Sequence, residues 1–227
     1  MKTFCIIVAG GKGLRMGSDI PKQFLLLDGR PILIRTLEAF ISYDPFMEII
    51  LALPADHFPY WKKLCEKYNF KYALKLVEGG KTRYHSVKNA LQTINGDGIV
   101  AVHDGVRPLI TSGFIDNCYK EAEKYKTAIP CIPVTESMRE ISEKSNHQVD
   151  RSKFVLIQTP QVFKVQLLKE AFLQPYRKEF TDEANLVEKV GIPVHLTTGI
   201  PENIKITNRI DLLFAEAFIA ASGPEKQ

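Results

Sequence analysis

The chain has 227 residues, of which 30 are basic and 26 acidic, for a formal net charge of +4. These charges are scattered rather than gathered into a stripe, which argues against nucleic acid as a partner. No apolar run approaches the roughly 20 residues that a membrane span needs, and the N-terminal segment lacks a small-residue cleavage site. We therefore expect a cytoplasmic protein with no membrane partner, and the lack of a linker predicts a single domain over residues 1–227.

Short β-branched runs alternate with amphipathic segments of helical length. The runs predict buried strands of the parallel kind, and they are "FCIIVA" from Phe4, "EIILALP" from Glu48, "GIVAVHD" from Gly98 and "TAIPCIPV" from Thr127. The intervening segments predict helices over residues 32–41, 58–68, 86–94 and 112–125, the last with Ser112 as its N-cap. This order predicts an α/β protein with a Rossmann-like, doubly wound, mostly parallel sheet that binds ligands beyond the carboxyl ends of its strands.

One segment interrupts the alternation. Residues 136–155 contain two polar strand-like stretches around a turn-prone "KSNH", and neither stretch has enough apolar residues to be buried on the sheet. We interpret this segment as a β-hairpin arm, at about 136–157, that projects from the domain. Such an arm needs a partner surface, which suggests a homodimer.

The first predicted strand runs into a glycine-rich loop, "AGGKGLRMGSDIPKQF". Glycines after a strand leave backbone N–H groups free to surround an anion. The glycines of this loop are Gly10, Gly11 and Gly13. Their spacing matches neither the dinucleotide fingerprint nor the P-loop, so a simple tight turn is the alternative. Arg15 and Lys22 bracket the loop, and two such cations can neutralise the charge that develops in nucleotidyl transfer. For Lys22 the alternative is a solvated surface lysine.

A second signal is "VHDGVRP", at the end of an apolar strand. Asp104 is the candidate Mg²⁺ ligand, because a hard carboxylate oxygen suits that cation and phosphates can complete its shell. The alternative is that Asp104 caps the turn that follows. Arg107, which Pro108 stiffens, is either a phosphate contact or a member of a structural salt bridge.

Three further segments carry weaker signals. The glycine pair of "GGKTRYHSV", before a predicted helix start at Ser86, can bring backbone groups against a flat base. Lys205 lies in the otherwise apolar "NIKIT", where solubility alone does not explain a lysine. Thr181, followed by two acidic residues, favours a helix N-cap with first-turn acids over a binding role.

Six motifs occur in the order found in the 2-C-methyl-D-erythritol 4-phosphate cytidylyltransferase family, which the chain resembles from Ile6 to about Phe218. They are "AGGKGLRMGSDIPKQF", "EGGKTRYHSV", "VHDGVRP", "VDRSKFVLIQTPQVF", "TDEANLVEKVG" and "NIKIT". The resemblance implies that CTP and methylerythritol phosphate react, with Mg²⁺ as cofactor, to give the CDP-alcohol and pyrophosphate. It also implies a homodimer with shared active sites, because the family's arm reaches into the neighbouring subunit.

The resemblance further assigns roles to individual residues. Arg15 and Lys22 match the family's transition-state stabilisers, and Asp104 matches the residue near the ribose and metal. Arg151 and Lys205 match the pair that positions the methylerythritol phosphate. The other matches are Ala9, Gly10, Gly11 and Gly13 around the CTP phosphates, Gly80 and Ser86 at the cytosine, and Arg107, Ser137, Thr159 and Thr181 as further alcohol-substrate contacts.

Two alternative functions stay open. The loop start at residues 8–11 has a form shared with ribitol 5-phosphate cytidylyltransferases, and Lys81 stands where an acidic residue is common, whereas "TDEANLVE" and "VDRS" favour the methylerythritol enzymes. A non-catalytic nucleotide-binding protein is the alternative from another class. Such a protein has little use for Arg15, Lys22 and Lys205 together.

Overall fold

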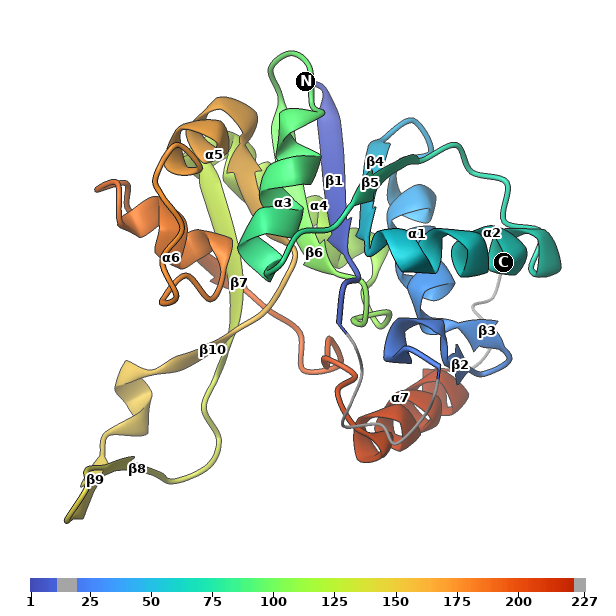
Figure 1. Ribbon diagram of the computed structural model, residues 1–227. Helices are drawn as coiled ribbons and strands as arrows, with labels where there is room; N and C mark the ends of the chain where they lie inside the picture. Colours follow the sequence, from blue (N-terminus) through green and yellow to red (C-terminus); the bar gives the residue numbers. More distant parts are fainter. Residues whose placement is uncertain (12–19, 223–227) are drawn as a thin grey trace.

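A computed structural model describes residues 1–11 and 20–222 of the chain (Figure 1). Strand β1 (Thr3–Val8) lies inside the main sheet and pairs in parallel with β4 (Glu48–Leu53) and β6 (Ile99–Asp104). Strand β5 (Lys75–Glu78) continues the parallel pairing beyond β4. The inner strands are apolar runs because helices cover both of their faces. The predicted α/β fold with a mostly parallel sheet is confirmed.

The other half of the sheet is mixed. Strand β11 (Gln161–Lys164) pairs antiparallel with both β6 and β7 (Thr127–Pro133). Strand β10 (Val155–Ile157) pairs antiparallel with the end of β7, and β12 (Leu196–Thr198) pairs with β7 in parallel. The prediction that β7 lies among parallel neighbours is therefore wrong in part, because two of its three partners run in the opposite direction.

Alternate side chains of β1 enter two separate cores, Cys5 and Ile7 on one face and Phe4 and Ile6 on the other. The first core is covered by α1 (Ile32–Tyr43), α2 (Phe58–Lys67) and α4 (Ser112–Tyr125). The second is covered by α3 (Arg83–Gln92), α5 (Val165–Ala171) and α6 (Glu183–Glu188). No helix in the described part of the chain combines the length and apolar character that crossing a membrane requires.

A smaller third cluster lies beside the main sheet. The two-stranded ribbon of β2 (Leu26–Leu27) and β3 (Arg30–Pro31) contacts the C-terminal helix α7 (Arg209–Ser222). Leu27 of the ribbon, Ala215 of α7, and Ile206, which precedes α7, are all buried in this cluster. Two short 3₁₀ helices lie between other elements: η2 (Lys22–Phe24) comes before β2, and η3 (Ala55–His57) before α2.

The predicted helix starts at residues 32, 58 and 112 are confirmed, but two predicted N-caps are wrong by one residue and the start predicted at Ser86 is wrong by three. Helix α4 is capped by Thr111, whose side chain accepts from Phe114 N, so Ser112 is inside the helix. Helix α3 begins at Arg83 rather than at Ser86. An N-cap oxygen must reach an amide two or three residues ahead, and at α6 Asp182 rather than Thr181 does this, by accepting from Asn185 N.

The predicted arm is present as a hairpin that projects away from the main sheet (Figure 1). Strands β8 (Met138–Ile141) and β9 (Asn146–Val149) pair antiparallel. The turn lies at residues 142–145 and not at "KSNH", because Asn146 already pairs with β8. After β9 a 3₁₀ helix, η4 (Arg151–Lys153), leads back to β10, which pairs with the main sheet.

Candidate active site

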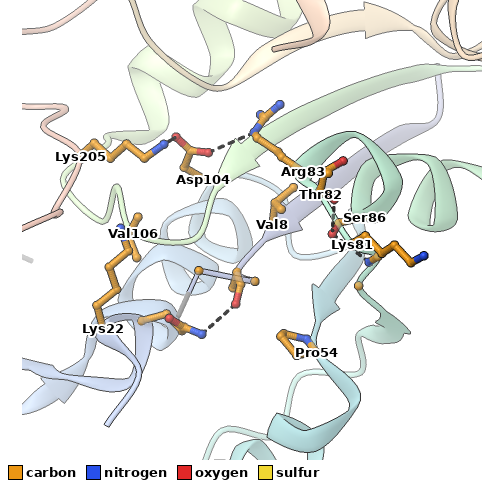
Figure 2. Close-up of a pocket in the computed structure, with 16 residues that line it drawn as sticks. Val8, Lys22, Pro54, Lys81, Thr82, Arg83, Ser86, Asp104, Val106 and Lys205 are labelled. Carbon is orange, nitrogen blue, oxygen red and sulfur yellow. Dashed lines mark hydrogen bonds and ion pairs between the residues drawn. The ribbon is translucent and has the colours of Figure 1, made fainter. Parts of the chain in front are cut away.

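A pocket of about 320 Å³ opens where β1 and β6 end (Figure 2). A doubly wound sheet binds its ligands at this edge, so the position agrees with the sequence-based expectation. Three segments and a few single residues form the lining, namely Val8 to Gly11, Lys22 and Gln23, Gly79 to Arg83, and Pro54, Ser86, Asp104, Val106 and Lys205. The pocket thus combines predicted residues from loops that lie far apart in the sequence.

The loop after β1 contributes backbone to this lining. Gln23, which is buried, donates from Nε2 to the carbonyl oxygen of Ala9 at 2.8 Å and so ties η2 to the loop. As a result Lys22 passes close to Gly11, since a Cβ added to that glycine would lie 3.5 Å from Lys22 Cε. Ala9, Gly10 and Gly11 line the pocket. The predicted Gly13 and Arg15 lie outside the described residues.

The opposite wall is a backbone loop fixed by Ser86. Its hydroxyl accepts from Gly80 N at 3.0 Å and donates to the carbonyl oxygen of Thr82 at 3.1 Å. A side chain at residue 80 has no room, because an added Cβ would lie 2.3 Å from His85 Cβ. Gly80 therefore lets the loop lie flat against α3, which suits the predicted contact with a planar base.

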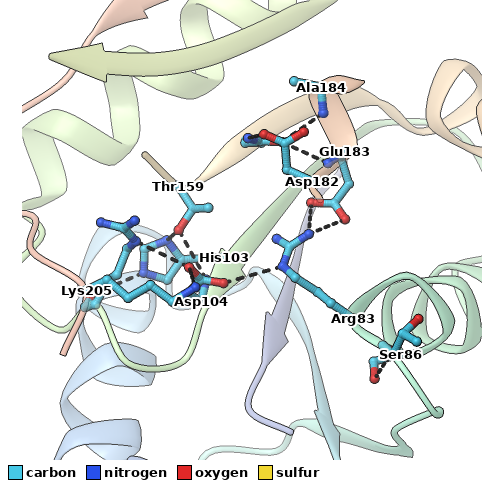
Figure 3. A network of polar contacts seen from close by, with 12 residues as sticks. Arg83, Ser86, His103, Asp104, Thr159, Asp182, Glu183, Ala184 and Lys205 are labelled. Carbon is cyan, nitrogen blue, oxygen red and sulfur yellow. Dashed lines mark hydrogen bonds and ion pairs between the residues drawn. The ribbon is translucent and has the colours of Figure 1, made fainter. Parts of the chain in front are cut away.

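Asp104 joins three cations at the floor of the pocket (Figure 3). Its Oδ1 lies 3.5 Å from Arg83 Nε, and its Oδ2 lies 3.0 Å from Lys205 Nζ and 3.4 Å from Arg107 Nε. Burial alone would raise the pKa of Asp104, but the charges of Arg83, Lys205 and Arg107 outweigh burial and hold it well below its usual range. The carboxylate is thus ionised, and its contacts are cationic side chains rather than a turn that it caps.

Sequence reasoning missed the ion pair behind Asp104. Arg83 Nη1 donates to both carboxylate oxygens of Glu183, at 2.6 and 2.7 Å, and Glu183 is only 2% exposed. Burial lowers the pKa of Arg83, but the charges of Glu183 and Asp104 outweigh burial and raise it. Burial also raises the pKa of Glu183, and the charge of Arg83 opposes this effect.

A buried glutamine completes the connection to α6. Gln161 Oε1 accepts from the backbone N–H of Glu183 at 3.1 Å and of Ala184 at 3.0 Å, and its Nε2 donates to Asp182 at 2.9 Å. These bonds satisfy amides at the helix start that have no partner within the helix. The network therefore joins the pocket floor to the first turn of α6.

Three predicted substrate contacts lie beside the main pocket and not in its described lining. Arg107 donates from Nη1 to the carbonyl oxygen of Asn203 at 2.6 Å, and its Nε pairs with the Asp104 carboxylate. These contacts match the alternative prediction for Arg107, a structural salt bridge. Thr159 is buried, and its hydroxyl contacts His103 Nδ1 at 3.0 Å. Thr181 is exposed and borders a small separate hollow at the start of α6.

Two other predicted residues lie on the arm. Ser137 and Arg151 are exposed and line a second hollow, formed by β8, β9 and the start of η4. Arg151 donates to the carbonyl oxygen of Thr135. Neither residue is among the described residues that line the main pocket. The predicted site residues that the structure describes thus lie in or beside the main pocket, at the hollow near Thr181, or on the arm.

The charge of the main pocket indicates its ligand class. Among the described lining residues, the basic ones outnumber the acidic one, and they are Lys22, Lys81, Arg83 and Lys205 against Asp104. A pocket with this excess of positive charge and with backbone-lined walls suits a nucleoside polyphosphate. Fold and site together define an α/β nucleotide-binding protein of the nucleotidyltransferase class.

Comparison with known proteins identifies the family. The sequence model of 2-C-methyl-D-erythritol 4-phosphate cytidylyltransferase matches residues 3–221, and the chain belongs to this family. The enzyme of that name from Bacteroides thetaiotaomicron is 50% identical over 219 residues, which cover 96% of this chain and 100% of the relative. The one from Bacillus cereus is 40% identical over 217 residues, or 94% of this chain and 96% of the relative.

Solved structures agree with this result. The crystal structure of 2-C-methyl-D-erythritol 4-phosphate cytidylyltransferase from Thermus thermophilus superposes with a TM-score of 0.80 at 33% identity, covering 97% of this chain and 100% of that chain. The bifunctional IspDF of Campylobacter jejuni superposes with a TM-score of 0.80 at 28% identity, covering 94% of this chain and 54% of that chain. The fold of the present chain is the fold of this family.

Proposed function

We propose that the chain transfers the cytidylyl group of CTP to 2-C-methyl-D-erythritol 4-phosphate and releases pyrophosphate. A phosphate oxygen of the alcohol substrate forms a bond to the α-phosphorus of CTP, and the bond from that phosphorus to the oxygen bridging to the β-phosphate breaks. The nucleophile is already an anion, so the reaction needs no strong general base. It needs cations that cancel the repulsion between two polyanions.

The pocket residues fit the steps of this reaction. The loop of Gly10 and Gly11 offers backbone N–H groups to the triphosphate, and Lys22 beside it offers a positive charge. Gly80 and Ser86 form the flat wall for the cytosine. Lys205 lies 3.0 Å from Asp104 in the pocket lining, which supports a role in orienting the phosphate of the second substrate. Arg15 completes the set as a further stabiliser of transition-state charge.

Mg²⁺ is the proposed cofactor, with Asp104 as its protein ligand. The Asp104 carboxylate fits a hard cation because it is ionised and lines the pocket. No group of three or more potential ligand side chains occurs among the described residues, so the nucleotide phosphates would supply most of the coordination shell. When bound, Mg²⁺ supplies neutralisation of phosphate charge.

We also propose that two chains form a homodimer in which each arm completes the other active site. Five large apolar side chains of the arm and β10 are exposed in the single chain, and they are Ile141, Phe154, Val155, Leu156 and Ile157. Exposed apolar side chains at four consecutive residues, 154–157, are typical of a surface that a partner covers. A neighbouring chain is the natural recipient of Ser137 and Arg151, since they are separate from the pocket of their own chain.

The single observation that carries the proposal is the basic pocket at the ends of β1 and β6. The test is pyrophosphate release by the purified protein with CTP and Mg²⁺, comparing 2-C-methyl-D-erythritol 4-phosphate with ribitol 5-phosphate. We expect turnover with the first substrate. Turnover only with ribitol 5-phosphate would change the alcohol but keep the chemistry, and release with neither would leave a nucleotide-binding protein.

Two sets of variants extend this test. Lys22→Ala should lower turnover by about three powers of ten, as expected for a charge that contributes about 4 kcal/mol in the transition state. Lys62→Ala, which removes an exposed lysine of α2, should leave turnover unchanged. Inactive Arg151→Ala and inactive Lys22→Ala proteins should regain activity when subunits exchange. Lack of recovery after proven subunit exchange would argue against the shared site.

The cytoplasmic location of the protein stays a prediction.

A further inference from the structure

Lys205 lies on a segment without regular secondary structure. The segment, residues 199–206, lies between β12 and α7. Lys205 Nζ reaches from it to within 3.0 Å of Asp104 Oδ2 at the pocket floor (Figure 3). A side chain on an irregular segment is placed accurately only if other elements hold the backbone on which it stands. The contacts that hold residues 199–206 therefore decide where the charge of Lys205 lies.

Backbone hydrogen bonds hold the two ends of this segment. Gly199 N donates to the carbonyl oxygen of Cys131 on β7 at 2.8 Å. Ile206 N donates to the carbonyl oxygen of Val106, in the turn after β6, at 3.0 Å. These two bonds leave the middle of the segment, which turns sharply before Lys205, to be held by side chains.

The side chain of Gln158 holds that turn. Asn203 N donates to the carbonyl oxygen of Ile200 at 3.1 Å, which closes the turn. Gln158 Nε2 donates to the same carbonyl oxygen at 2.8 Å, and Gln158 Oε1 accepts from Ile200 N at 3.1 Å. Oε1 also accepts from Asn203 Nδ2, over a longer distance of 3.4 Å. One side chain thus contacts both ends of the turn.

These contacts require an amide side chain of this length. The carbonyl oxygen of Ile200 can only accept and its N–H can only donate, so residue 158 must present a donor and an acceptor side by side. Methionine has a similar length but no N–H donor, and its sulfur is a weak acceptor. Gly199 leaves room for the amide, because an added Cβ would lie 2.6 Å from Gln158 Oε1. Gln158 and Gly199 are thus matched to each other.

Gln158 itself stands on the main sheet. It lies between β10 and β11, is 4% exposed, and donates its backbone N–H to the carbonyl oxygen of Pro130 on β7 at 2.8 Å. Asn203, which is buried, carries the connection onward. Its Nδ2 donates to the carbonyl oxygen of Thr159 at 2.8 Å, and its own carbonyl oxygen accepts from Arg107 Nη1 at 2.6 Å. The turn at residues 200–203 is thereby joined to the sheet and to the turn after β6.

We propose that Gln158 is a positioning residue for Lys205, which holds the turn at residues 200–203 and so sets the place from which Lys205 reaches the phosphate of the alcohol substrate. The proposal rests on the proposed function, which gives Lys205 that contact. Gln158 is not among the described residues that line the pocket, so it acts through the segment that it holds. The walls proposed for CTP belong to other loops. A defect at Gln158 should therefore fall on the alcohol phosphate and spare CTP.

The first test needs no activity. Hydrogen–deuterium exchange, read by mass spectrometry, reports how firmly residues 199–206 are held. In Gln158→Met this segment should exchange at least about tenfold faster than in the wild type. Gln174→Met is the matched control, since Gln174 Nε2 donates to the carbonyl oxygens of Ala171 and Leu186 outside the pocket lining, and it should leave exchange in the segment unchanged. Equal exchange in Gln158→Met and the wild type would overturn the proposal.

Steady-state kinetics separate positioning from a general loss of stability. Gln158→Met should raise the KM for the alcohol phosphate about tenfold and change the KM for CTP less than about twofold. Gln174→Met should leave both KM values unchanged. If Gln158→Met does not fold, Gly199→Ala takes its place, because the new Cβ displaces Gln158 Oε1, and the same split is expected. Equal effects on both substrates, or an effect on neither, would overturn the proposal.

A double variant tests the route through Lys205. Once Lys205→Met has removed the phosphate contact, a shift of the segment should matter little. Gln158→Met combined with Lys205→Met should therefore keep the kcat/KM of Lys205→Met for the alcohol phosphate to within about twofold. Defects that multiply would mean that Gln158 acts elsewhere and would overturn the proposal. Failure of wild-type turnover would instead refute the proposed function, and hydrogen exchange would still decide whether Gln158 holds the segment.

Discussion

Glu183→Gln tests whether the buried ion pair behind the pocket stabilises the fold. The substitution keeps the size of the side chain and one oxygen that can accept from Arg83, but it removes the negative charge. Glu183 is 2% exposed, and Arg83 Nη1 contacts both of its oxygens within 2.7 Å. The change therefore leaves the Arg83 guanidinium with half of its main partner, on the side of the group that is buried.

The expected size of the effect follows from the contacts that remain. Leaving one member of a buried ion pair unpaired costs about 3 to 5 kcal/mol. Arg83 keeps its contact with Asp104 at 3.5 Å, and its side chain is 25% exposed, so some of the charge stays compensated. We expect a loss of about 2 to 3 kcal/mol in the free energy of unfolding, or a fall in Tm of about 5 to 10 °C for a chain of this size.

Urea unfolding followed by circular dichroism measures this loss. Glu179→Gln is the matched control, because Glu179 is 54% exposed and its basic partners lie 3.7 and 3.8 Å away, so we expect less than about 0.5 kcal/mol. Adding Arg83→Met to Glu183→Gln should cost at least about 1 kcal/mol less than the sum of the two single changes. A loss below about 1 kcal/mol for Glu183→Gln, or strict additivity, would refute the argument.

Three further outcomes are expected. Gly80→Ala should raise the KM for CTP about tenfold, because the new Cβ would overlap His85 Cβ at 2.3 Å and push the loop from α3; an unchanged KM would contradict this packing. Lys205→Met should lower kcat/KM for the alcohol phosphate about a hundredfold in the pyrophosphate assay, since a charge-assisted contact is lost, and a loss under threefold would argue against its role. Cys5 and Cys118 are both fully buried, and burial raises the pKa of Cys118 to about 12. A thiol reagent should therefore label at most Cys65 and Cys131 before denaturation.

The parts of the fold that could be predicted are the strongly periodic ones. The apolar runs at β1, β4 and β6 predicted their strands because burial on both faces demands continuous hydrophobicity. Strands β5, β11 and β12 were not predicted, since they have three or four residues and β5 and β12 are only partly buried. Short segments of this kind become strands because a neighbouring strand offers hydrogen bonds, and a local pattern does not contain that information.

The site likewise contains residues that the sequence predicted and residues that it did not. The sequence places Asp104 and the glycine loop at strand ends, where the topology of a doubly wound sheet brings them together. Glu183 was predicted only as an acidic residue in the first turn of a helix, which the structure confirms, but it is also buried and pairs with Arg83, 100 residues away in the chain. His103 was likewise passed over, because its two partners are a backbone carbonyl and a threonine 56 residues away. Long-range polar contacts leave no local trace in sequence.

The choice of cation at each position separates support from ligand binding. Arg83 and Arg107 each use two different nitrogens on two different partners, Glu183 with Asp104 and Asp104 with Asn203, as a rigid guanidinium fork allows. Lys205 has a single charged nitrogen, which pairs with Asp104 alone among the contacts described, and its side chain is 42% exposed against 12% for Arg107. An ammonium group on a flexible stem can follow a phosphate whose charge moves during the reaction. The two arginines are therefore suited to fix the pocket floor, and the proposed phosphate contact falls to the more exposed Lys205.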